Sequence, residues 1–233
     1  MNNEPSTIFP DFIPPEAKNL SESTSFNLLQ KIERQSIVTP LYKQPIETAY
    51  IRQGNSKTPI LLLHGFDSSV IEFRRLFPLL AANNETWAVD LLGFGFTERI
   101  AELSFATAAI KTHLYCFWKT LIQKPILLVG ASMGGATAID FTLTYPEVVD
   151  KLVLIDSAGL ANPPVTAKLM FYPLDYLATA FLRHPKIRQN ISRAAYYDKR
   201  LANEDAQLCT ALHLNCTGWR QALIAFTKNG GYG

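Results

Sequence analysis

The sequence has only three cysteines, Cys116, Cys209 and Cys216, and none of them forms a C-x-x-C pair. A sparse, odd count is typical of a reducing compartment, and we expect free buried thiols. Cys209 and Cys216 also lack the mutual spacing of zinc ligands. We therefore expect no metal and no cofactor.

Long apolar runs and blocks of one charge are also missing. No stretch reaches about 18 uninterrupted apolar residues, and the N-terminus has no apolar signal-peptide core, so we expect no membrane insertion and no secretion. The 22 Lys+Arg nearly balance the 20 Asp+Glu, which gives a net charge of +2 and no electrostatic reason to bind nucleic acid. We predict a cytoplasmic protein whose partner is a small-molecule substrate.

Apolar residues, by contrast, make up 48% of the 233 residues, which is enough for one sizeable core. Residues 1–25 are rich in Pro, Ser, Asn and Glu and predict an irregular leader. A helical pattern follows at residues 26–37. Residues 160–228 contain no clean buried-strand run and predict several helices, at 166–181, 187–197, 203–212 and 219–227.

Between these regions, strand and helix patterns alternate. Four short apolar runs, each followed by a turn signal, have the continuous apolar character of strands buried on both faces of a parallel sheet. They are residues 60–63, 87–89, 126–129 and 152–155, with an outer strand expected at 48–52. Helical patterns occur at residues 71–82, 105–122 and 134–144. The alternation predicts an α/β fold with a mostly parallel, doubly wound sheet.

The strongest chemical signal is Gly-Ala-Ser-Met-Gly-Gly at residues 130–135, which fits G-x-S-x-G between a buried strand and a helix. Glycines on both sides make a sharp, strained turn sterically possible, and the turn raises the serine hydroxyl clear of the sheet. We predict Ser132 as the catalytic nucleophile and the N–H of Met133 as an oxyanion donor. The supporting residues are Gly130, Gly134 and Gly135. The alternative is an incidental glycine-rich turn.

A second signal is His-Gly-Phe at residues 64–66, directly after a buried strand. The N–H of Phe66 is the natural second donor of an oxyanion hole. We expect His64 and Gly65 to support this loop, and His64 to orient it rather than to move protons. In a third segment, Gly93 and Gly95 predict a tight turn, with Phe94 or Phe96 as candidates to line a pocket.

Together these segments resemble the α/β-hydrolase family. The chain carries H-G-F at 64–66, D-L-x-G-x-G-x-T at 90–97, G-x-S-M-G-G at 130–135 and Y-P-E-x-V-x-x-L-V-L-I-D at 145–156. The resemblance covers about residues 45–160 and implies an α/β-hydrolase core at 26–159 and a helical cap or lid at 160–233. Because the residue at the turn of residues 130–135 is a serine, the resemblance points away from epoxide or haloalkane hydrolysis. It points toward ester, thioester or carbon–carbon bond hydrolysis.

The rest of the catalytic triad is the missing piece. In this family the order is Ser, acid, His, so His64 and His113 come too early, while His184 and His213 fall in the expected cap. We expect His213 to be structural. The resemblance implies that the triad acid and histidine lie beyond Gly233, so we expect this chain, as a fragment, to be inactive.

Three functions remain open at this stage. The first is a serine hydrolase that acts on an ester, thioester or carbon–carbon bond of a small apolar substrate, for which an aromatic-rich cap offers a pocket. The second is a non-catalytic ligand-binding protein of the same fold. The third is an accessory protein that faces lipid through the cap.

Overall fold

The computed structural model describes residues 9–159 and 174–232. Within these ranges, six strands form one sheet in the order β1-β2-β4-β3-β5-β6. The strands are β1 (Glu33–Ile37), β2 (Ile46–Gln53), β3 (Ile60–Leu63), β4 (Thr86–Val89), β5 (Ile126–Ala131) and β6 (Val149–Ile155). The strands β3 to β6 pair in parallel, whereas β1 pairs antiparallel with β2, and β2 with β4. The predicted α/β class with a mostly parallel sheet is confirmed.

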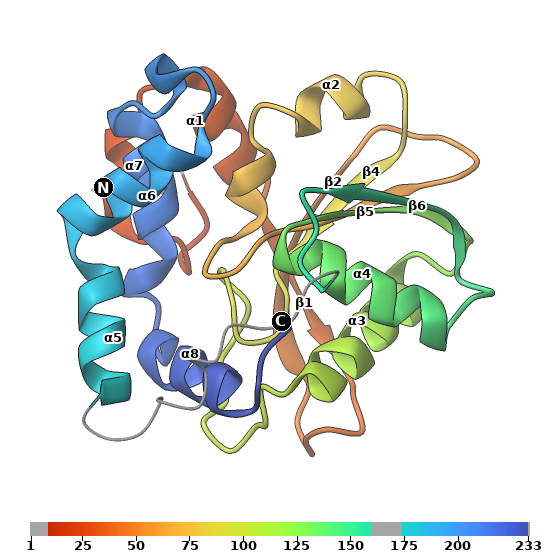
Figure 1. Cartoon of the computed structure of the whole chain (residues 1–233). Coiled ribbons are helices and arrows are strands. Elements are labelled where there is room, and N and C mark those ends of the chain that lie inside the picture. The colour runs from red at the N-terminus through yellow and green to blue at the C-terminus, as the bar shows by residue number, and fades with distance from the viewer. Residues whose placement is uncertain (1–8, 160–173, 233) are drawn as a thin grey trace, which may run out of the picture.

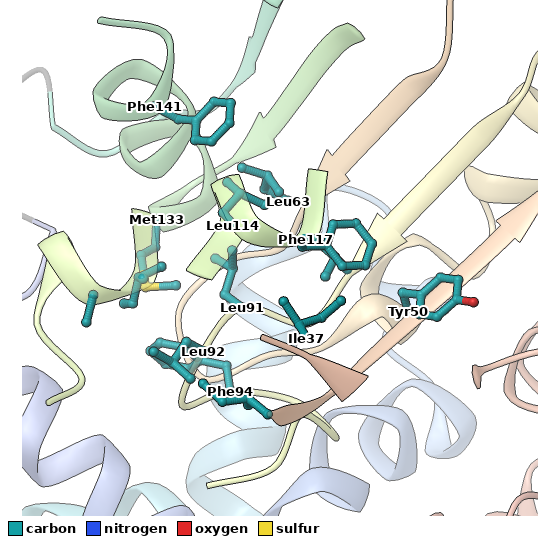
Figure 2. Packing of buried hydrophobic residues seen from close by; sticks show 14 of the residues in the cluster. Ile37, Tyr50, Leu63, Leu91, Leu92, Phe94, Leu114, Phe117, Met133 and Phe141 are labelled. Carbon is teal, nitrogen blue, oxygen red and sulfur yellow. The ribbon is translucent and has the colours of Figure 1, made fainter. Parts of the chain in front are cut away.

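Two hydrophobic clusters cover the two faces of the sheet. The side chains of β3 alternate between them, because Leu61 and Leu63 belong to one cluster and Ile60 and Leu62 to the other. The helices α3 (Thr107–Leu121) and α4 (Met133–Thr144) lie over the first face, as Figure 1 shows. Figure 2 shows the packing on this face, where aromatic and leucine side chains fill the space between helix and sheet.

The second face is covered by shorter elements. They are α1 (Ser23–Leu29), the 3₁₀ helix η2 (Val70–Phe73) and α2 (Phe77–Ala81). A single helix was expected at residues 71–82, and this expectation is wrong. Pro78 lies in the first turn of α2, where a missing N–H is tolerated, but inside a longer helix it would break the hydrogen-bond ladder.

The remaining helices form what is called here the C-terminal helical region, residues 174–228. They are α5 (Leu174–Arg183), α6 (Pro185–Ala195), η4 (Lys199–Leu201), α7 (Glu204–Ala211), η5 (Leu212–Asn215) and α8 (Trp219–Lys228). Figure 1 shows them gathered at one side of the molecule, together with the N-terminal segment. The helical prediction is confirmed here within a few residues, although most of the helix expected at 166–181 lies outside the described residues.

The N-terminal predictions need correction. Residues 9–25 are not irregular throughout, because they contain the 3₁₀ helix η1 (Pro15–Asn19) and the start of α1. Ile13 and Ala17 are buried in the second cluster. The carboxylate of Asp205 in α7 accepts hydrogen bonds from the N–H groups of Ser21 and Glu22, at 2.6 and 2.8 Å. Partners so distant along the chain leave no local signal.

The helix expected at residues 26–37 is also wrong in its second half. The helix α1 ends at Leu29, and Glu33–Ile37 forms the edge strand β1. Every residue of β1 is paired with a residue of β2, from Glu33 with Tyr50 to Ile37 with Ile46. A half-exposed edge strand with polar residues has no continuous apolar run, so pairing with β2 decides its conformation.

The glycines of residues 130–135 allow a close approach between strand and helix. A Cβ added to Gly134 would lie 2.2 Å from the carbonyl oxygen of Leu63, and one added to Gly130 would lie 2.3 Å from the carbonyl oxygen of Gly134. No side chain fits at either distance. The N-terminus of α4 therefore lies directly against the end of β3, and this contact brings residues 130–135 and 64–67 to one edge of the sheet.

We expect Gly134→Ala to lower the free energy of unfolding by roughly 3 kcal/mol, because the added methyl group must push β3 and α4 apart. Gly65→Ala is the matched control, since a Cβ there meets its neighbours at 3.4 Å or more. Urea denaturation of both variants measures the difference. Equal stability of the two would contradict the close-approach explanation.

Candidate active site

Ser132 lies at the turn between β5 and α4 with φ 50° and ψ −117°. A non-glycine residue in this conformation is strained and persists only where its surroundings hold it. Four hydrogen bonds do so here. The N–H of Ser132 donates to the carbonyl of Ile155 at 3.0 Å, and its carbonyl accepts from the N–H groups of Gly135 at 2.9 Å, Ala158 at 3.0 Å and Ala136 at 3.3 Å. The strain is thus fixed by β6 and α4 together.

The side chain of Ser132 remains accessible. The residue is exposed, and its hydroxyl does not cap α4. The next residue, Met133, is the first of α4, so its N–H has no acceptor within the helix. The positive end of the helix dipole also lies here. An exposed hydroxyl therefore stands beside a backbone donor, in surroundings that favour negative charge.

The 64–67 loop lies against this turn. Because β3 and β5 are parallel neighbours, their carboxyl ends meet at the same edge of the sheet. A Cβ added to Gly65 would lie 3.5 Å from the Cβ of Ser132. Among the described residues, no hydrogen-bond acceptor is found for the N–H of Phe66 or of Met133. The sheet thus brings the loop that carries the Phe66 N–H next to the helix that begins at Met133.

His64 determines the direction of the Phe66 N–H. The N–H of Leu91 donates to Nε2 of His64 at 3.1 Å, so Nε2 is the unprotonated nitrogen. Its Nδ1–H therefore donates to the carbonyl of Gly65 at 2.8 Å. That carbonyl shares a planar peptide unit with the N–H of Phe66, so holding one holds the other. Burial lowers the pKa of His64 to about 4, which keeps the imidazole neutral.

A second brace acts on the same loop through Glu72 of η2. Its Oε2 accepts the N–H of Gly65 at 3.0 Å. Both polar groups of Gly65 are thus occupied, the carbonyl by His64 and the N–H by Glu72. The sequence analysis missed Glu72, because nothing in its local pattern marks it as a partner of the loop.

Asp67 is a second residue of this region that sequence reasoning overlooked, although it directly follows Phe66. Its Oδ1 accepts the indole N–H of Trp219 at 2.7 Å and the Nε2–H of His213 at 3.1 Å. Its Oδ2 pairs with Nη1 of Arg188 at 2.6 Å. Burial acts to raise the pKa of Asp67, but the bond from His213 and the charge of Arg188 outweigh it and lower the pKa to about 2.

None of the chain's four histidines, all of which lie in the described residues, is hydrogen-bonded to Ser132. His64 braces the loop, His113 bonds Thr48 Oγ1 through Nε2 at 2.8 Å, and His213 bonds Asp67. His184 lies exposed at the N-terminus of α6. The structural role expected for His213 agrees with its buried contact to Asp67. The described residues therefore bring no imidazole to the serine.

Aromatic side chains surround the 64–67 loop. The ring of Phe66, which is 42% exposed, lies 5.9 Å from that of Phe226 and 6.1 Å from that of Phe94, centroid to centroid. Of the two residues suggested for a pocket, Phe94 is part of this group, whereas Phe96 is fully buried in the other cluster. An apolar wall, formed by Phe66, Phe94 and Phe226, thus stands next to the 64–67 loop.

The described residues contain no group of three or more His, Cys, Asp or Glu that could hold a metal ion. In the same part of the chain, no helix is both long and apolar enough to cross a membrane. The three cysteines are free thiols.

Comparison with known proteins gives a family. Residues 58–214 match the model of the alpha/beta hydrolase fold. The alpha/beta hydrolase domain-containing protein VTE7 of Arabidopsis thaliana is 37% identical over 234 residues, a match that covers 96% of this chain and 70% of VTE7. The 2-hydroxy-6-oxo-6-(2'-aminophenyl)hexa-2,4-dienoic acid hydrolase of Metapseudomonas resinovorans is 34% identical over 119 residues, and the match covers 49% of this chain and 40% of that enzyme.

Solved structures agree on the fold. An esterase from Thermogutta terrifontis superposes with a TM-score of 0.67 at 21% identity, over 84% of this chain and 71% of the esterase. The meta-cleavage product hydrolase CumD of Pseudomonas fluorescens superposes with a TM-score of 0.63 at 23% identity, over 81% and 66% of the two chains. At such identities the likeness concerns the fold alone.

The Asp67 cluster predicts a pH dependence of stability. A carboxylate whose pKa is about 2 in the folded protein and 3.8 ordinarily contributes stability above about pH 4 that is lost as the pH falls toward 2. We expect about 2 kcal/mol from this source. Asp67→Asn should therefore be less stable at neutral pH and should lose less stability between pH 4 and pH 2, measured by urea denaturation. Asp198→Asn is the control. Because Asp198 pairs with the exposed Arg200, this substitution should hardly change the stability that is lost between pH 4 and pH 2.

Proposed function

The chain belongs to the alpha/beta hydrolase fold family, and from that premise we propose that it carries the nucleophile of a serine hydrolase. The proposed substrate is a small apolar molecule with an ester, thioester or carbon–carbon bond next to a carbonyl group. One observation carries the proposal, namely that Ser132 stands exposed on a strained strand–helix turn with the 64–67 loop directly beside it.

In the proposed reaction, Oγ of Ser132 attacks the carbonyl carbon while a base takes the hydroxyl proton. The N–H groups of Phe66 and Met133 hold the negative charge that develops on the carbonyl oxygen. The bond to the leaving group then breaks, the leaving group takes the proton, and water releases the acyl group from the serine. His64 and Glu72 serve this step indirectly, because His64 holds the peptide unit that carries the Phe66 N–H and Glu72 holds the peptide unit before it.

The base is the part of the mechanism for which residues 9–159 and 174–232 offer no candidate at hydrogen-bonding distance from Ser132. We propose that the triad acid and histidine lie beyond Gly233. The contacts of His64, His113 and His213 support this, because each of these imidazoles is buried and engaged elsewhere. The matched relatives are also longer than the region they share with this chain.

Two observations support the substrate class. Phe66, Phe94 and Phe226 form an apolar wall next to the loop, which suits an apolar or ring-bearing acyl group. The relatives from Metapseudomonas resinovorans and from Pseudomonas sp. CF600, a 2-hydroxymuconate semialdehyde hydrolase, are named for hydrolysis of unsaturated keto acids or semialdehydes. Carbon–carbon bond hydrolysis therefore stands beside ester hydrolysis as a proposed reaction.

One prediction of the proposed function concerns the nucleophile. In the complete gene product, a fluorophosphonate probe should label Ser132, and Ser132→Ala should abolish the labelling, because the probe reacts only with an activated serine. Ser157→Ala is the matched control, since this nearby hydroxyl donates to the carbonyl of Ala158 and should not be needed. Unlabelled but correctly folded protein would instead support the ligand-binding alternative.

Another prediction of the proposed function concerns the base. We expect the purified 233-residue chain to hydrolyse p-nitrophenyl acetate or butyrate at least about a thousandfold more slowly than the complete gene product, because without a base only the oxyanion donors and binding contribute. Initial rates of both proteins at equal concentration test this. Comparable turnover by the two would mean that the base lies within the chain.

A further inference from the structure

We infer that Asp67 is a positioning residue through which the C-terminal helical region holds the oxyanion loop in its working geometry. The inference rests on the proposed function, because the 64–67 loop matters in this way only if Phe66 donates to an oxyanion. In this inference, the carboxylate of Asp67 couples the 64–67 loop to the C-terminal helical region, which is distant in sequence.

The first step is that, within the part of the chain that the structure describes, the carboxylate of Asp67 is held from the C-terminal helical region. The three side chains that bond its carboxylate belong to the C-terminal helical region, namely Arg188 of α6, His213 of η5 and Trp219 at the start of α8. Asp67 as a residue is only 8% exposed, so water does not replace these partners of its carboxylate. A movement of the helices would therefore pull on Asp67 directly.

The second step is that Arg188 extends the connection to further helices. Its Nη2 donates to the carbonyl of Thr210 in α7 at 2.6 Å, and its Nη1 also approaches the carbonyl of Leu182 in α5 at 3.4 Å. The same guanidinium contacts the backbone carbonyl of Asp67 at 3.4 Å. One side chain thus ties the loop to the helices α5, α6 and α7.

The third step is the backbone conformation of the loop. Asp67 has φ 48°, in the left-handed region that non-glycine residues adopt at a cost. The peptide unit between Gly65 and Phe66 is already fixed, because Nδ1–H of His64 donates to the Gly65 carbonyl. Phe66 therefore stands between a neighbour held by the core and a neighbour held by the helices, so release of Asp67 frees the chain on one side of the donor.

The fourth step is that packing alone does not account for this cluster. Nδ1 of His213 and Nε of Arg188 are buried without a hydrogen-bond partner among the described residues. Unpartnered buried polar atoms cost stability, and apolar side chains of similar volume often replace buried ion pairs without loss. Directional bonds to one carboxylate instead specify where Asp67 lies.

The test measures phosphonylation of Ser132 in the complete gene product with a fluorophosphonate probe at several probe concentrations. For Asp67→Asn we expect the maximal labelling rate to fall about 10- to 100-fold with little change in the half-saturating probe concentration, because an oxyanion donor acts on the transition state. Asp198→Asn, which alters a half-buried aspartate in the same helical region that does not contact the 64–67 loop in the described residues, should label at the wild-type rate.

Trp219→Phe is the second variant, in case Asp67→Asn does not fold. It removes a single hydrogen bond to Asp67 and keeps an aromatic ring in place, so we expect a smaller fall in the maximal rate. Labelling of either folded variant at the wild-type rate would overturn the inference, since a purely structural residue lowers the melting temperature without changing this rate.

Hydrogen–deuterium exchange separates this inference from the proposed function. In Asp67→Asn, amides of the 64–67 loop should exchange faster, while those of Asp198→Asn should not. If the wild-type protein is not labelled at all, the proposed function fails, and the exchange experiment still decides whether Asp67 holds the loop. Unchanged exchange in Asp67→Asn would overturn the inference in either case.

Discussion

The close approach of α4 to the end of β3 is the constraint on which the candidate site depends. Gly134 lies so near the carbonyl of Leu63 that a methyl group has no room. Because of this contact, Ser132 stands at the same edge of the sheet as the 64–67 loop rather than several ångströms above it. The strained backbone of Ser132 follows from the same geometry, since the chain must reverse from strand to helix within one residue.

The elements predicted well are those with a strong local signal. The strands β3, β4 and β5 are buried apolar runs that end in turns, and the serine turn is marked by glycines whose need is steric and local. The strand β6 forms where it was predicted, but the expectation that it is buried on both faces is wrong, because it is the last strand of the described sheet and its residues 153–155 are exposed. The failures lie where conformation depends on distant partners. The strand β1 is a polar edge strand defined by pairing with β2, and the N–H groups of Ser21 and Glu22 are held by Asp205, more than 180 positions away.

The same distinction explains what was missed in the site. Ser132, Gly65 and Phe66 could be read from motifs, whereas Asp67 gains its significance from Arg188, His213 and Trp219, which lie 121, 146 and 152 positions further along the chain. Its only local signal was its place directly after Phe66. A buried acid with three basic or polar partners is recognisable once contacts are known, but sequence spacing does not indicate which of 20 Asp+Glu residues it is.

Hydrophobic contacts and hydrogen bonds contribute differently to the structure of the 64–67 loop. The aromatic rings of Phe66, Phe94 and Phe226 bury apolar surface, but such contact is non-directional and would tolerate rotation of the backbone beneath it. The bonds of His64 to the Gly65 carbonyl and of Asp67 to the helices are directional. In the proposed site, an oxyanion donor is useful only when it points at one place, so we propose that the polar groups define its geometry and that the rings select the substrate.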